Sequence, residues 1–222
     1  MLMRVQNVVL LRVQTINKTY MKKMIIDSSS DDIKYKNLGI TAISPDYTSI
    51  ENMIKIANNF NIPYNLIDPD NPDSIGINPF TFDDPLKTAV AISSVLKSMY
   101  NTTHTDVEEA FRDNVTSQAI ENLSILLKVM YPKLNDGDLP NLTDMLEMLT
   151  DFDLVEEMCR KMEYDPELST KYRMQISYFK KNFYRSGSGR IDTEKFVYSA
   201  VTQLDNLLRN EGVRNILCNR ND

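Results

Sequence analysis

Residues with catalytic or metal-binding chemistry are few in this sequence and widely spaced. His104 is the only histidine, and Cys159 and Cys218 are the only cysteines. One histidine leaves little scope for Ser-His-Asp or Cys-His catalysis. Two distant cysteines form neither a zinc signature nor a disulfide framework. We therefore predict two reduced thiols, no metal site and no catalytic residue.

Two loops superficially resemble ligand-binding motifs. Asp68, Asp70 and Asp73 suggest a calcium-binding loop, but Pro72 occupies the third ligand position and no glutamate stands at the twelfth. The run SGSGR at 186–190 is glycine-rich, but it follows a predicted helix and no Lys-Ser or Lys-Thr pair follows it. We predict no calcium site and no phosphate-binding loop, and we interpret 186–190 as a flexible connector.

The strongest positive signal is charge segregation. Residues 136–167 contain eleven acidic side chains, opposed only by Arg160 and Lys161. Residues 171–195 contain seven basic side chains, opposed only by Asp192 and Glu194. The net charge of −6 argues against a uniformly basic nucleic-acid-binding protein but leaves room for a local basic patch.

The basic stretch is interleaved with aromatic residues, a combination that suits single-stranded nucleic acid, because cations follow the backbone and rings stack on bases. The alternative interpretation is a solvated face opposite the acidic stretch, with Phe179 and Phe183 in the core. Both interpretations stay open at this point. The candidate nucleic-acid or partner contacts are Lys171, Arg173, Lys180, Lys181, Tyr184, Arg185, Arg190 and Lys195.

A long predicted helix at 106–131 is the element around which the others must be arranged. Thr105 and Glu108 can form a capping box at its start, and Pro132 is expected to end it. A polar row at Asn114, Gln118 and Asn122 is predicted to be half-buried and hydrogen-bonded between helices. Its apolar stripe recurs at steps of three and four through Val107, Phe111, Val115, Ala119, Leu123, Leu126, Leu127 and Met130.

Further helices are predicted from Pro85 to about 100, at 142–149, 154–162 and 167–184, and from Asp192 to a C-terminal glycine at Gly212. Short loops join them, which is typical of an all-α bundle. Before them, residues 40–67 predict strand, helix and strand, a βαβ unit with a parallel strand pair. The fold class is therefore mainly α, preceded by a short βαβ segment.

Four segments are predicted: an uncertain N-terminal segment at 1–37, the βαβ segment and linker at 38–82, the all-α domain at 83–216 and a tail at 217–222. No apolar run reaches the roughly 18–20 residues that cross a bilayer. The N-terminus also lacks the pattern of a signal peptide. A cytoplasmic location is the corresponding expectation.

Several runs, in this order, resemble the TraG/TraD-like coupling proteins of type IV secretion and conjugation. They are INPFTFDDPLKTAVAISSVLKSMY (77–100), FRDNVTSQAIENLSILLKVMYPKL (111–134), LPNLTDMLEML (139–149) and FYRSGSGRIDTEKFVYSAVTQLDNLLRNEGVRNILC (183–218). The run at 40–80 resembles the stretch that leads out of the family's nucleotide-binding domain. The resemblance covers roughly residues 38–220 and rests on this co-linear order.

The resemblance implies a membrane-anchored, hexameric P-loop ATPase with a RecA-like motor domain at the cytoplasmic face of the membrane. An inserted all-α domain contacts single-stranded DNA, the relaxase or relaxosome accessory proteins, and ATP and Mg²⁺ act in the motor. Residues 38–82 correspond to a remnant of that motor, and residues 83–215 to the inserted domain.

This sequence shows neither Walker motif. We therefore expect no cofactor and no ATPase activity for the chain alone. We also expect the chain to be an excised domain or a truncated gene product. Two alternatives remain. One is a stand-alone helical adaptor that binds a protein through its acidic 136–167 segment. The other is an ATPase that gains its phosphate loop from another chain.

Overall fold

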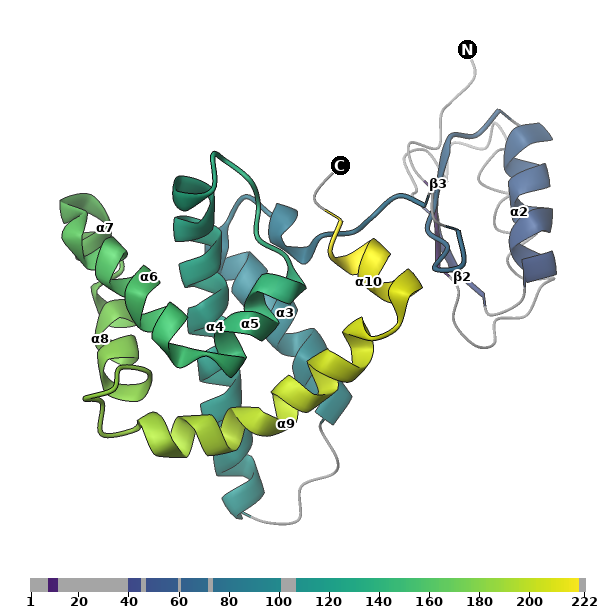
Figure 1. The fold of residues 1–222 in the computed structure, drawn as a ribbon. Helices are drawn as coiled ribbons and strands as arrows, with labels where there is room; N and C mark the ends of the chain where they lie inside the picture. Colours follow the sequence, from purple (N-terminus) through teal and green to yellow (C-terminus); the bar gives the residue numbers. More distant parts are fainter. Residues whose placement is uncertain are drawn as a thin grey trace. The chain divides into compact units, whose positions relative to one another are not determined.

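The computed structural model describes residues 8–11, 40–44, 47–59, 61–71, 74–100 and 107–219. This described part is mainly helical, which confirms the mainly α part of the predicted fold class (Figure 1). The chain divides into two compact units, residues 1–75 and 76–222. The predicted capping residue Thr105, His104 and most of segment 1–37 lie outside the described residues.

The first unit contains a small parallel sheet and one helix. Strand β1 (Val8–Leu11) lies in the middle, with β2 (Ile40–Ile43) and β3 (Tyr64–Leu66) parallel to it on either side. Helix α2 (Tyr47–Asn59) connects β2 to β3. The two strands are parallel members of one sheet but do not pair directly, because β1 lies between them. The buried apolar residues of this unit are Ala42, Ile50, Met53, Ala57 and Ile62.

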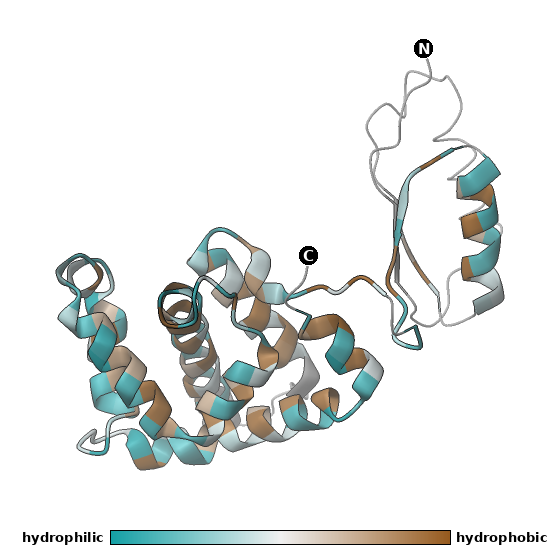
Figure 2. Ribbon diagram, turned by 45° about the horizontal axis from the view of Figure 1, so that its top comes forward, coloured by the Kyte–Doolittle hydropathy of each residue, from teal (hydrophilic) through white to brown (hydrophobic). Residues whose placement is uncertain are grey.

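The second unit, 76–222, is helical in its described residues. It begins with a short 3-10 helix, η2 (Pro79–Thr81), followed by α3 (Pro85–Tyr100) and the long α4 (Val107–Leu134). The chain then forms α5 (Leu142–Thr150), α6 (Phe152–Tyr164), α7 (Pro166–Lys171), α8 (Arg173–Asn182), α9 (Arg190–Leu208) and α10 (Glu211–Leu217). Helix α4 contacts α3, α5, α6, α8 and α9. It is therefore the helix around which the others are arranged, as predicted. Polar and apolar residues alternate along these helices (Figure 2).

The apolar stripe of α4 is confirmed over its second half but not at its start. Five of its residues are buried, whereas Val115 is half-buried and Phe111 is 57% exposed. The predicted stop at Pro132 is also wrong, because the helix continues to Leu134. Left-handed backbone at Asp136 and Gly137 then turns the chain. The buried stripe residues are Ala119, Leu123, Leu126, Leu127 and Met130.

The polar row on α4 differs from its prediction. Asn114 and Gln118 are exposed and Asn122 is half-buried. The side-chain amide of Asn122 donates to the carbonyl of Gln118 in its own helix, at 2.8 Å, and not to another helix. The row faces solvent because the neighbouring helices cover the apolar side of α4.

Aspartate and asparagine caps set the boundaries of the middle helices. Asn141 and Asp144 form a capping box at the start of α5, Asp151 caps α6, and Asp165 caps α7. Tyr172 separates α7 from α8, so the predicted single helix at 167–184 is two helices. Gly212 lies inside α10 and does not end α9.

The two ends of the helical unit meet. The backbone N–H of Ile77 donates to the carbonyl of Ile216 at 2.7 Å. Buried Asn78 donates to the carbonyl of Pro140 at 2.8 Å, and Asn141 donates to the carbonyl of Cys218 at 3.3 Å. We call these three bonds the terminal clasp, because they join the first residues of the unit to its last helix and to α5.

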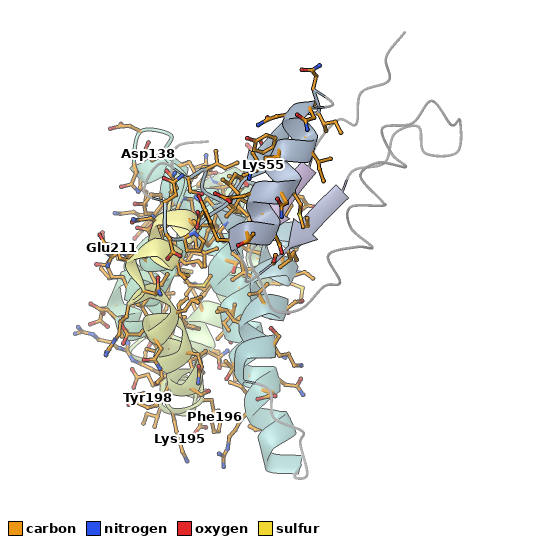
Figure 3. The ribbon with its side chains drawn as sticks, turned by 90° about the vertical axis from the view of Figure 1, so that its right-hand side faces the viewer. Lys55, Asp138, Lys195, Phe196, Tyr198 and Glu211 are labelled. Atoms are coloured by element: carbon orange, nitrogen blue, oxygen red, sulfur yellow. The ribbon has the colours of Figure 1, made fainter. Side chains whose placement is uncertain are left out.

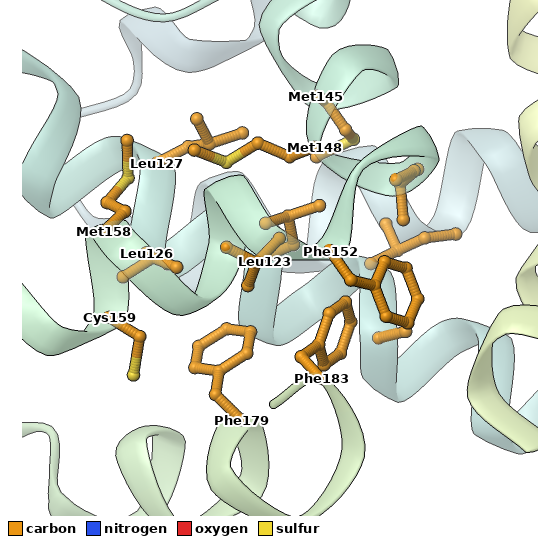
Figure 4. Packing of buried hydrophobic residues seen from close by; sticks show 14 of the residues in the cluster. Leu123, Leu126, Leu127, Met145, Met148, Phe152, Met158, Cys159, Phe179 and Phe183 are labelled. Carbon is orange, nitrogen blue, oxygen red and sulfur yellow. The ribbon is translucent and has the colours of Figure 1, made fainter. Parts of the chain in front are cut away.

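An aromatic cluster fills the core where α6 meets α8 (Figure 4). The rings of Phe152 and Phe183 lie 4.2 Å apart, and those of Phe179 and Phe183 lie 5.3 Å apart. Phe179 and Phe183 are fully buried. They are therefore core residues, as the alternative interpretation of the basic stretch held, and cannot stack on a ligand.

Candidate nucleic-acid interface

The basic candidates divide into those that are paired inside the unit and those that are not. Lys180 pairs with Glu163, and both Arg185 and Arg190 pair with Asp153. These carboxylates belong to α6, the centre of the acidic stretch. The alternative interpretation, a basic face opposite the acidic stretch, therefore accounts for Lys180, Arg185 and Arg190.

Asp153 is the centre of this pairing. Its two carboxylate oxygens accept from the Arg185 guanidinium, with Nε at 3.1 Å, and from Nη1 of Arg190 at 3.2 Å. The hydrogen bond from Arg185, assisted by Arg190, lowers the pKa of Asp153 to about 2. Arg190 also donates to the carbonyl of Phe183 at 2.9 Å, which ties the start of α9 to the end of α8.

Asp153→Asn should change the acid sensitivity of the protein. The pKa of Asp153 is depressed in the folded state, so its contribution to stability is complete above the unfolded value of 3.8. The contribution falls as pH drops from about 4 towards about 2, because protonation breaks the pairs with Arg185 and Arg190. Thermal unfolding of both proteins should show wild type more stable near neutral pH. The difference should shrink over this window, and a constant difference would contradict the prediction.

Tyr184 does not have the accessible ring predicted for a contact residue. It is 4% exposed, and the Arg160 guanidinium lies 4.9 Å from its ring centroid. Burial raises the pKa of Tyr184 and also that of the neighbouring Cys159 thiol. The prediction failed because the chain turns inward after α8, which directs this ring towards α6.

Four of the predicted cations form no ion pair within the described part of the chain: Lys171, Arg173, Lys181 and Lys195. All four are exposed. Two of them lie over aromatic rings, Lys171 5.3 Å from the centroid of Tyr172 and Lys195 5.9 Å from that of Phe196. Figure 3 shows Lys195, Phe196 and Tyr198 close together on α9.

One of these cations, Lys181, lines a cleft between α4, α8 and the start of α9. The cleft has a volume of about 500 Å³. Phe111 and Phe196 form an edge-to-face pair in its wall, with centroids 5.9 Å apart. The full lining consists of Phe111, Val115, Gln118, Met174, Ser177, Tyr178, Lys181, Asn182, Ser188, Gly189, Asp192, Thr193 and Phe196.

The loop before α9, predicted to be a flexible connector, lines this cleft with Ser188 and Gly189. The N–H of Gly189 donates to the carbonyl of Lys181 at 2.9 Å. A Cβ at Gly187 would clash with that same carbonyl oxygen, and one at Gly189 would clash with Oδ1 of Asn182. The two glycines therefore permit a close approach to the end of α8.

The acidic stretch is largely engaged within the unit. Asp153, Glu156, Glu157 and Glu163 form ion pairs or hydrogen bonds to cations on α6, on α8 or just after it. The aspartates at 144, 151 and 165 cap helices. Few carboxylates of residues 136–167 therefore remain for contact with a partner protein, which the adaptor alternative requires.

Several cleft residues were missed by the sequence reasoning. Phe111 was assigned to the core stripe, and Met174, Ser177 and Asn182 were not singled out. No sequence signal distinguishes these residues, because their common position depends on how three helices pack. Their exposure in the folded unit is what identifies them.

In the ranges that the structure describes, no group of three or more His, Cys, Asp or Glu side chains could hold a metal ion. None of the described helices is long and apolar enough to cross a membrane. We compared the chain with protein-family models, curated proteins and solved structures, and none of them matches it.

Proposed function

We propose that this chain supplies the substrate-contacting helical domain of a conjugative type IV secretion coupling protein. In this proposal the helical unit holds single-stranded DNA that is bound to its relaxase, and it hydrolyses no ATP itself. The ATP and Mg²⁺ chemistry belongs to a motor domain with which the unit assembles, as a hexamer in the full-length relatives. The cytoplasmic side of the membrane is the corresponding location.

One observation carries the DNA-binding part of the proposal: four of the predicted contact cations form no ion pair within the described residues, and three of them lie close to aromatic rings. Lys181 lies in the cleft with Phe111 and Phe196, while Lys171 and Lys195 lie over rings of their own. Cations of this kind release counterions from a nucleic-acid backbone, and rings stack on unpaired bases.

The terminal clasp supports the domain-insertion part of the proposal. A domain inserted into another must begin and end at nearly the same place, and the bond between Ile77 and Ile216 brings the two ends of the helical unit together. The parallel strands of the first unit, with α2 as the crossover from β2 to β3, are compatible with a small part of a RecA-like α/β domain.

Lys181→Gln should weaken binding to single-stranded DNA and make it less salt-dependent. Loss of one phosphate contact reduces the slope of log affinity against log salt by roughly 0.7. Lys180→Gln is a matched control, because it removes the same charge one residue away from a side chain already held by Glu163. Fluorescence anisotropy of a labelled oligonucleotide, titrated at several salt concentrations, measures both slopes.

The DNA-binding proposal fails if wild type shows no salt-dependent binding to single strands, or if the two glutamine variants behave alike. Duplex DNA of the same length tests the preference for single strands. A pull-down with a relaxase, with and without its bound strand, tests the second half of the proposal separately.

A further inference from the structure

The cleft combines three kinds of group whose interactions are not used inside the protein. Phe111 is 57% exposed and Met174 is 77% exposed, which leaves apolar surface open at the wall. Lys181 and Asp192 also line the cleft, and neither forms an ion pair within the described residues, although their charges are opposite. A ligand with matching groups would use the exposed apolar surface and both charges.

We infer that the cleft binds one unstacked nucleotide of a single strand and prefers bases that carry an exocyclic amino group. This inference rests on the proposed function and assigns the DNA contact to a particular site. The volume of about 500 Å³ lies within the roughly 300–1,000 Å³ of small-ligand sites, so it accepts a nucleotide but not a duplex.

The base has a stacking surface in the cleft. Phe111 forms an edge-to-face pair with Phe196. Its side chain is still 57% exposed, so part of the ring is accessible to a flat ligand. Stacking on aromatic side chains is the usual way in which proteins bind bases of single strands, and it tolerates every base. The accessible side chain of Met174 adds apolar contact at the same wall.

The charged pair orients the nucleotide. The ammonium of Lys181 attracts the phosphate, while the carboxylate of Asp192 repels it and accepts hydrogen bonds from amino groups. A carboxylate at this position therefore favours cytosine, adenine or guanine over thymine, which has no exocyclic amino group. Gln118, which also lines the cleft, offers its side-chain amide to the remaining edge of the base.

The chain contains no tryptophan, so Phe111→Trp introduces a single fluorescent indole at the exposed position. An oligo(dC) strand should quench this indole on binding, because a base stacks on it, and an abasic strand with the same number of phosphates should not. Equal quenching by the abasic strand would overturn the inference.

Phe111→Ala should weaken binding to oligo(dC) roughly tenfold. Tyr164→Ala is the matched control, because Tyr164 is an exposed aromatic residue of α6 that does not line the cleft, and it should leave the affinity unchanged. Circular dichroism confirms that both variants fold. Equal affinities of the two variants would contradict the assignment of the cleft.

Wild type should bind oligo(dC) more tightly than oligo(dT). Asp192→Asn should bring these two affinities closer together.

The outcomes separate the two proposals. Salt-dependent binding without quenching of the indole in the Phe111→Trp protein overturns the cleft assignment and leaves the proposed function standing. Absence of strand binding overturns both, and competition by an unrelated peptide in the quenching assay would assign the cleft to a protein partner instead.

Discussion

Phe183→Ala should lower the free energy of unfolding of the helical unit by about 3–5 kcal/mol, the range for truncating a buried aromatic residue. Phe183 is fully buried between Phe152 and Phe179, so removal of its ring leaves a cavity among rings that cannot collapse easily. It lies at the end of α8, and its carbonyl accepts from Arg190.

Urea denaturation followed by far-ultraviolet circular dichroism measures this loss, because helices dominate that signal. Tyr198→Ala removes an aromatic side chain that is 71% exposed. We expect it to change the free energy of unfolding by less than about 0.5 kcal/mol. If Phe183→Ala lowered the free energy of unfolding by no more than this control does, the packing of α6 against α8 would not depend mainly on the aromatic cluster.

Asn78→Ala should cost about 2–4 kcal/mol, an unusually large effect for a polar residue. Its side chain is 2% exposed, accepts from the N–H of Phe80 at 3.0 Å and donates to the carbonyl of Pro140 at 2.8 Å. Truncation leaves both backbone groups unsatisfied in a buried place, and each such group costs about 1–3 kcal/mol.

Asn114→Ala is the matched control, because Asn114 is an exposed asparagine on α4. Alanine has the higher helix propensity, so this variant should be neutral or slightly stabilising. The urea midpoints of the two variants should therefore lie on opposite sides of the wild-type value or differ widely. Similar midpoints would show that the terminal clasp contributes little.

Regularities within one helix were predictable from the sequence. The spacing of Leu123, Leu126 and Leu127 predicted a buried stripe, and they are buried, because periodicity determines which side of a helix is apolar. Pro85 correctly marked the start of α3. Errors came where local signals competed with packing: Pro132 lies in the last turn of α4 and Gly212 inside α10, although both were expected to end helices.

Relations between helices were not predictable. Charge counting identified an acidic and a basic stretch. It could not predict that Asp153 forms ion pairs with Arg185 and Arg190, while Lys181 forms none within the described residues. Lys180 and Lys181 are adjacent and chemically identical, and only the packing of α8 against α6 distinguishes their roles. The same holds for Phe111, whose apolar character predicted burial.

The terminal clasp has a consequence for the order of folding during synthesis. Two of its three bonds end at Ile216 and Cys218, so a ribosome must have made almost the whole unit before these two bonds can form. The core around α4 is complete in sequence before α10 emerges. Bringing distant segments together costs loop-closure entropy. The packing of the earlier helices already brings these segments close before α10 is added. These two bonds are therefore made late, by the last helix, whereas the bond from Asn78 to Pro140 can form earlier.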